Sequence, residues 1–124
     1  MTKASLMTLV SGGSYAQREA AIAASLLKLP SNQTIAVVLE GLPNGTHVLL
    51  DSTSLRVHRI APGCMCCIGN LAMRVTLNRI FRLSPSYLYV SLSSADHLEK
   101  VVLFLQQPAY GNILQLEQNL QLTS

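Results

Sequence analysis

A short, uninterrupted apolar run, Ile-Ala-Val-Val-Leu, occupies residues 35–39. A strand with one face in water alternates apolar and polar residues, whereas a strand of a parallel sheet is covered on both faces and lacks that alternation. The β-branched residues of the run also favour extended backbone. The run therefore predicts a strand that is buried on both faces of a parallel sheet.

Strand-like and helix-like segments alternate along the rest of the chain. Apolar or alternating segments predict further strands at residues 5–10, 47–50, 55–60 and 87–90. Apolar stripes with helical spacing predict helices between Ser14 and Pro30, over about 69–83, and between Ser94 and Pro108. The tail, residues 111–124, fits either a helix or a strand. This alternation implies an α/β fold with a mainly parallel sheet flanked by helices, in a single domain of residues 1–124.

The first of these helices is predicted from an apolar face, which is the face that a surface helix normally turns toward the core. Four residues share that face and two more lie beside it: Ala16, Ala20, Ala23 and Leu27, with Ile22 and Leu26. Arg74, Arg79 and Arg82 belong to the next predicted helix. We interpret them as its solvated side, with a patch for an acidic partner as the alternative.

Composition narrows the classes of function. Hydrophobic residues make up 49% of the 124 residues and charged residues 12%, so the chain is a folded protein whose apolar surface we expect a protein partner or a second copy to cover. The net charge of +3 is spread without a basic block, and there are no Trp and only two Phe, so nucleic-acid binding is not expected. The first ten residues are too polar for a signal peptide or a membrane span, and we expect a cytoplasmic protein without membrane contact.

All three cysteines of the chain lie within four consecutive positions, as Cys64, Cys66 and Cys67. Cysteines at the start of a helix are deprotonated more readily, and the thiolate is the form that binds a metal. Soft sulfur ligands suit zinc or Cu(I), and three thiolates leave the fourth position of a zinc tetrahedron open. The cluster therefore predicts a zinc site, the alternative being that the cysteines only pack a turn.

The order of elements and two motifs resemble the first half of the CobW-type P-loop GTPases, which are metallochaperone and metal-insertion proteins. Gly-Cys-Met-Cys-Cys at 63–67 is similar to the family's Gly-Cys-x-Cys-Cys metal site, and Ser-Leu-Ser-Ser-Ala-Asp at 91–96 is similar to a family motif that follows a strand. The resemblance implies a P-loop NTPase-like fold in a chain truncated to the family's N-terminal domain, residues 1–124. It also implies a zinc-binding role in metal handling or regulation.

The resemblance also bears on the fourth metal ligand. Glu40 ends the second predicted strand, near the place where the family has an Asn-Glu pair, and is the first candidate. The other candidates are water, Asp51, His58 and His47. Sequence alone leaves these alternatives open.

The segment that matches the family's P-loop departs from it. By the match, Gly12, Gly13 and Arg18 are the residues that would contact a nucleotide. A working P-loop requires Gly-x4-Gly-Lys-Ser/Thr, whereas Arg18 stands at the Lys position, Glu19 at the Ser/Thr position and Gln17 at the second Gly. Glu19 would add a negative charge beside the phosphates, so bound GTP with Mg²⁺ and its hydrolysis are not expected.

Three functions remain open from the sequence. The first is zinc binding in metal handling or regulation, in a protein that is not an enzyme. The second is residual binding of GTP, which would make the chain a GTPase if any activity remained. The third is a structural or interaction module without a ligand, which binds a protein partner or forms a homo-oligomer.

Overall fold

The computed structural model describes residues 5–41, 48–60, 71–92, 102–103 and 114–122. Residues 102 and 103 are helical. The longer elements, in chain order, are β1 (Ser5–Gly12), α1 (Tyr15–Leu26), β2 (Ile35–Glu40), β3 (Leu55–Ile60), α2 (Leu71–Phe81), β4 (Tyr87–Ser91) and β5 (Leu114–Leu122).

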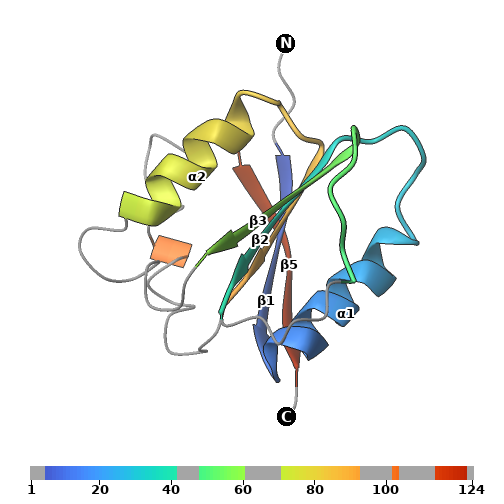
Figure 1. Cartoon of the computed structure of the whole chain (residues 1–124), viewed down its shortest axis with the longest axis vertical. Coiled ribbons are helices and arrows are strands. Elements are labelled where there is room, and N and C mark those ends of the chain that lie inside the picture. Colours follow the sequence, from blue (N-terminus) through green and yellow to red (C-terminus); the bar gives the residue numbers. More distant parts are fainter. Residues whose placement is uncertain (1–4, 42–47, 61–70, 93–101, 104–113, 123–124) are drawn as a thin grey trace.

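The five strands form one sheet in the order β3-β2-β4-β1-β5, and every pair of neighbours is parallel. Helices α1 and α2 cover opposite faces of this sheet (Figure 1). The predicted α/β class with a mainly parallel sheet is thus confirmed. The apolar run 35–39 forms most of β2, which lies inside the sheet between β3 and β4, and its residues 36–39 are buried.

The other strand predictions have mixed outcomes. The strands expected at 5–10, 55–60 and 87–90 are present, and the ambiguous tail forms β5. The strand expected at 47–50 is wrong over its described residues, because 48–50 form no strand. The backbone amides of Val48 and Leu49 instead donate hydrogen bonds to the carboxylate of Glu19, so they are not available for a strand ladder.

Two apolar cores lie on the two faces of the sheet, and each inner strand supplies alternate residues to both. On the α2 face Val38 packs with Leu77 and Ile80 of α2. On the α1 face Val37 and Leu39 pack with Ile22. The interior of the domain therefore depends on strands that are apolar on both sides, as the pattern of β2 predicts.

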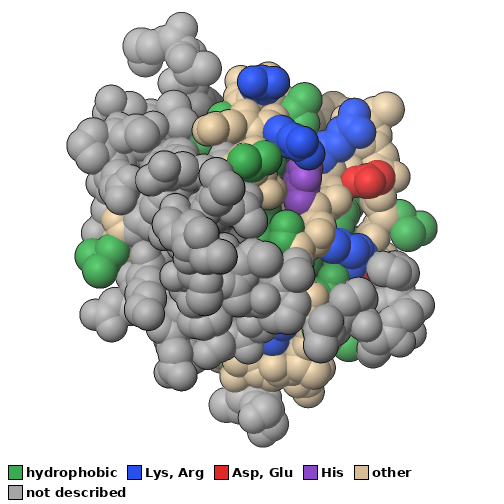
Figure 2. Space-filling model, turned by 60° about the vertical axis from the view of Figure 1, so that its left-hand side comes forward, with side chains coloured by type: hydrophobic (Ala, Val, Ile, Leu, Met, Phe, Trp, Pro, Cys, Tyr) green, Lys and Arg blue, Asp and Glu red, His purple; other side chains and the backbone are tan. Residues whose placement is uncertain are grey.

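Strand β3 forms one edge of the sheet and divides its side chains between the same two faces. Leu55 and Val57 pack on the α1 face, and Ile60 packs on the α2 face. By alternation Arg56 and His58 share the face of Ile60. Figure 2 shows basic side chains gathered around the one histidine of the described residues, His58.

The apolar face predicted for α1 packs on the sheet only in part, since Ile22 is buried and Ala23 and Leu26 pack beside it, whereas Ala20 is exposed. Leu27 is 88% exposed, whereas four residues of the helix are buried. The buried residues are Tyr15, Arg18, Glu19 and Ile22. Their spacing is that of one helix face, so α1 turns an arginine and a glutamate into the molecule. Hydrogen bonds and an ion pair compensate for the burial of these two charges, as described below.

Gly12 ends β1 with a positive φ of +81°, and a Cβ at this position would collide with the carbonyl oxygen of Leu122 on β5. We expect Gly12→Ala to lower the free energy of unfolding by about 2–4 kcal/mol, because it adds left-handed strain to a collision with backbone. Gly13 also has a positive φ, +65°, but its Cβ would meet only the flexible end of Gln17.

Gly13→Ala is therefore the matched control for the collision, with an expected loss of about 1–2 kcal/mol from backbone strain. Urea unfolding of the two variants measures the difference. Equal losses would contradict a specific role for the contact between β1 and β5.

Candidate functional site

Arg18 lies at the carboxyl ends of three strands, where its side chain is only 3% exposed. Its Nε donates to Ser91 Oγ at the end of β4 at 2.7 Å. Its Nη1 donates to the carbonyl oxygens of Gly12, at 3.4 Å, and Gly13, at 2.9 Å. Its Nη2 donates to the carbonyl oxygen of Glu40 at 3.2 Å. The guanidinium thus links the ends of β1, β2 and β4 to the start of α1.

The electrostatics of Arg18 reflect this position. Burial lowers the pKa of Arg18, and the negative charge of Glu40 and the hydroxyl of Tyr15 act against that lowering. Glu40 is itself completely buried. By alternation with Val38, Glu40 faces the α2 side of the sheet at its carboxyl edge. One buried carboxylate and one buried guanidinium therefore lie at the same end of β2.

Glu19, the next residue of α1, is the acceptor of a second network. Its carboxylate accepts from the amides of Val48 and Leu49 at 2.8 and 2.7 Å. It also accepts from both terminal nitrogens of Arg59 at 3.0 Å, in a two-pronged ion pair. The carboxylate is 1% exposed and the arginine 23%. This network ties α1 to β3 and to the segment before it.

The pKa values of the pair shift in opposite directions. Burial alone would raise the pKa of Glu19, but the hydrogen bonds from Arg59, Leu49 and Val48 and the charge of Arg59 together lower it. The pKa of Arg59 is raised, chiefly by its hydrogen bond to Glu19. Both groups are therefore charged at neutral pH.

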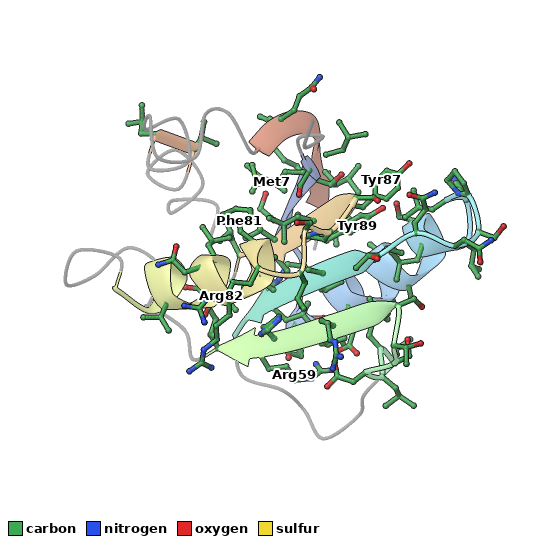
Figure 3. All side chains as sticks on the ribbon, turned by 90° about the horizontal axis from the view of Figure 1, so that it is seen from above. Met7, Arg59, Phe81, Arg82, Tyr87 and Tyr89 are labelled. Carbon is green, nitrogen blue, oxygen red and sulfur yellow. The ribbon has the colours of Figure 1, made fainter. Side chains whose placement is uncertain are left out.

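Arg59 has two further partners on the α1 face of the sheet. It donates to the hydroxyl of Tyr15 at 2.7 Å and to the carbonyl oxygen of Leu49 at 3.0 Å. Figure 3 shows Arg59 at β3, with Tyr87 and Tyr89 on the α1 side of the sheet and Phe81 on the α2 side. The arginine is thus held by one acid, one phenol and one backbone carbonyl.

The start of α1 uses its own backbone amides in a capping box. Ser14 Oγ accepts from the amide of Gln17 at 3.1 Å, and Gln17 Oε1 accepts from the amide of Ser14 at 2.7 Å. The amide of Arg18 donates to the carbonyl oxygen of Ser14. A P-loop presents such amides to phosphate, whereas here the amides of Ser14, Gln17 and Arg18 form hydrogen bonds within the turn.

Of the predicted metal ligands, Cys64, Cys66, Cys67 and His47 lie outside the described residues. Glu40 is buried, as described above. The described residues contain no group of three or more His, Cys, Asp and Glu side chains that could hold a metal ion. In the register of the sheet Glu40 lies opposite Ile60, the last residue of β3.

The other two candidates for the fourth ligand have different environments. Asp51 is exposed, and its Oδ1 accepts from the amide of Val57 at 2.7 Å, which covers part of the outer edge of β3. His58 is half-buried, and its Nε2 has no hydrogen-bond partner among the described residues. Among the described residues, Ser11 Oγ at the end of β1 is the other buried side-chain atom without a hydrogen-bond partner.

The pairing of Glu19 with Arg59 was not predicted from the sequence. The available signal was the helical spacing of Tyr15, Glu19 and Ile22, which puts the glutamate between two buried residues. Both partners were visible as charged residues, but their contact joins positions 40 residues apart in the chain. Local patterns do not carry that information.

Comparison of the chain with protein-family models, with curated proteins and with solved structures gives no match. The family resemblance therefore remains a hypothesis that rests on the quoted motifs. In the part of the chain that the structure describes, no helix combines the length and the apolar character needed to cross a membrane.

Proposed function

We propose that the chain is a metal-binding protein that takes up a zinc ion through Cys64, Cys66 and Cys67 and does not hydrolyse nucleotides. The observation that carries this proposal is the density of the cysteine run, three thiols within four positions. Three soft ligands from one short run of sequence suit zinc and leave its fourth position for a weaker ligand, which a recipient could displace. The role that follows is metal handling or regulation of a protein partner, in a relative of the CobW-type GTPases with a P-loop NTPase-like fold.

The ends of the cysteine segment support a site at the carboxyl edge of the sheet. Residues 61–70 connect Ile60, which ends β3, to Leu71, which begins α2. In open parallel α/β sheets, ligands bind beyond the carboxyl ends of the strands. The buried carboxylate of Glu40 ends the neighbouring strand opposite Ile60, which favours Glu40 as the fourth ligand.

The surroundings of Arg18 and Glu19 support the second part of the proposal. Both residues stand where a P-loop has its phosphate-binding Lys and its Mg²⁺-binding hydroxyl, yet both side chains are buried and bonded to the protein itself. The guanidinium of Arg18 donates to the carbonyl oxygens of Gly12 and Gly13. These oxygens carry partial negative charge, so they would repel a phosphate group beside the arginine. The segment acts as a structural joint between α1 and the sheet.

Elemental analysis of the full chain, purified without a histidine tag or chelator, tests the metal site. We expect about one zinc per chain and three thiols that are protected from a thiol reagent until a chelator is added. The double variant Cys66→Ser/Cys67→Ser should retain its helical circular dichroism but bind no stoichiometric zinc. Met65→Ser, which places the same new side chain between the cysteines, is the matched control and should bind zinc normally.

Wild-type zinc binding by the double cysteine variant would contradict the proposal. So would three reactive thiols and no metal, with no uptake of added zinc. A thermal melt with millimolar GTP and Mg²⁺ tests the absence of nucleotide binding, for which we expect an unchanged melting temperature. A rise in that temperature would favour a residual nucleotide site.

A further inference from the structure

A basic patch lies where β3 and α2 meet on one face of the sheet. It consists of Arg56 and His58 from β3, Arg79 from α2, and Arg82, which follows α2. The three arginines are exposed, whereas the histidine is half-buried. Figure 2 shows Lys and Arg side chains around the histidine on this face, with one acidic side chain nearby. We refer to these four residues as the β3–α2 patch.

The positive charges of the β3–α2 patch are not balanced within the described residues. The three arginines form no ion pair with another described residue. The one ion pair among the described residues joins Arg59 to Glu19 on the opposite face of the sheet. The acidic group that acts on His58 is Asp51, whose Oδ1 accepts from the amide of Val57. Like charges gathered without a counter-charge repel each other, so an anion bound here would relieve that repulsion.

The half-buried imidazole of His58 lies close enough to Arg56 and Arg79 to be affected by their charges. Its Nε2 is buried and has no hydrogen-bond partner among the described residues, a condition that costs free energy in a folded protein. Burial lowers the pKa of His58, Asp51 acts against this, and the charges of Arg79 and Arg56 lower it further. The ring is therefore neutral at pH 7 and keeps one N–H donor.

We propose that the β3–α2 patch binds a phosphate group, with the exposed Arg56 and Arg79 as its charged donors and the half-buried ring of His58 beside them. Arginine suits this role because its planar guanidinium presents paired N–H groups to phosphate oxygens. The dianionic group, with oxygens pointing in several directions, matches guanidinium groups from a strand and a helix better than the two oxygens of a carboxylate do. This site uses no cysteine and does not rest on the proposed zinc function.

The test is an NMR pH titration of the His58 ring, whose signal is assigned by its loss in His58→Gln. The full chain is titrated in sodium phosphate and in sodium chloride of equal ionic strength. We expect the titration midpoint of His58 to lie about one pH unit higher in phosphate, because the bound anion favours the imidazolium. Identical titrations in the two salts would overturn the proposal.

Variants of the arginines distinguish a specific phosphate site from a general effect of the anion on the positive charge of the protein. Arg56→Gln and Arg79→Gln should each weaken phosphate binding by about tenfold, the effect of losing one charged hydrogen bond. Lys28→Gln removes the same charge from an exposed position after α1 and is the matched control, with unchanged binding expected. Equal affinity in all three variants would contradict a built site.

The source of the phosphate group is distinguished with a second probe. Glycerol phosphate, a simple phosphomonoester, is added in place of inorganic phosphate and the same His58 signal is followed. Tighter binding of the ester supports a phosphorylated metabolite as the ligand, whereas equal or weaker binding supports inorganic phosphate. A response to neither probe would overturn the proposal.

Discussion

Glu19→Gln is expected to lower the free energy of unfolding by about 3–5 kcal/mol, the loss seen when one partner of a buried ion pair is removed. The substitution keeps the shape of the side chain but leaves Arg59 without its counter-charge. The amides of Val48 and Leu49 also lose a charged acceptor. Small domains are stable by only about 5–15 kcal/mol, so the loss is a large fraction of the whole. Urea unfolding with a two-state analysis measures it.

A double-mutant cycle with Arg59→Met distinguishes loss of the ion pair from general damage at α1. If the pair is responsible, the double variant should lose clearly less stability than the sum of the single variants, because it no longer buries one charge alone. Removing both charges can even approach neutrality. Additive losses would show that Glu19 acts through its backbone partners instead.

Acid should remove part of the same stabilisation in the wild type. The pKa of Glu19 is lower in the folded chain than its ordinary value of 4.5, so its contribution is fully present above pH 4.5. That contribution is lost as the pH falls below 4.5 and through the lowered folded value. We therefore expect the difference in urea midpoint between the wild type and Glu19→Gln to shrink from pH 6 to pH 3. A constant difference would contradict the assignment of the shift to Glu19.

Segments with strong periodicity were predicted well from the sequence. The run at 35–39 specifies β2 because its residues are apolar on both sides, and every competing structure would expose them. The tail was ambiguous because Ile113, Leu116 and Leu120 fit a helix, whereas Leu114 alternates with Leu116 and Leu120 with Leu122. Pairing with β1 decides in favour of a strand. Hydrogen bonds to a neighbouring strand are a tertiary property, which the local pattern does not contain.

The burial of Arg18 and Glu19 on the inner face of α1 and the lack of a strand at 48–50 could not be predicted, for a related reason. The alanines of α1 gave the clearest apolar face, but Arg18 and Glu19 are buried because partners from β3, β4 and the loop segment before β3 satisfy them. The same carboxylate takes the amides that a strand at 48–50 would have needed. The unrecognised long-range contacts of Arg18 and Glu19 therefore account for both errors.

Arg18→Met should be the second severe substitution, with an expected loss of about 3–5 kcal/mol in the free energy of unfolding. The methionine fills similar space but donates no hydrogen bond. It would leave Ser91 Oγ and the carbonyl oxygens of Gly12, Gly13 and Glu40 without this donor. It would also remove a positive charge that acts on the buried Glu40. Urea unfolding measures the loss, and circular dichroism checks that the variant folds.

Arg18→Lys is the matched variant, because it keeps the charge and introduces the residue type that a P-loop uses to bind phosphate. A single ammonium group cannot reproduce a fork that reaches β1, β2 and β4 together, so we expect an intermediate loss of about 2 kcal/mol. If Arg18 is a structural joint, this variant should also gain no stabilisation from GTP and Mg²⁺. A nucleotide-dependent rise in its melting temperature would instead mean that the turn retains a phosphate site from which Arg18 excludes the nucleotide.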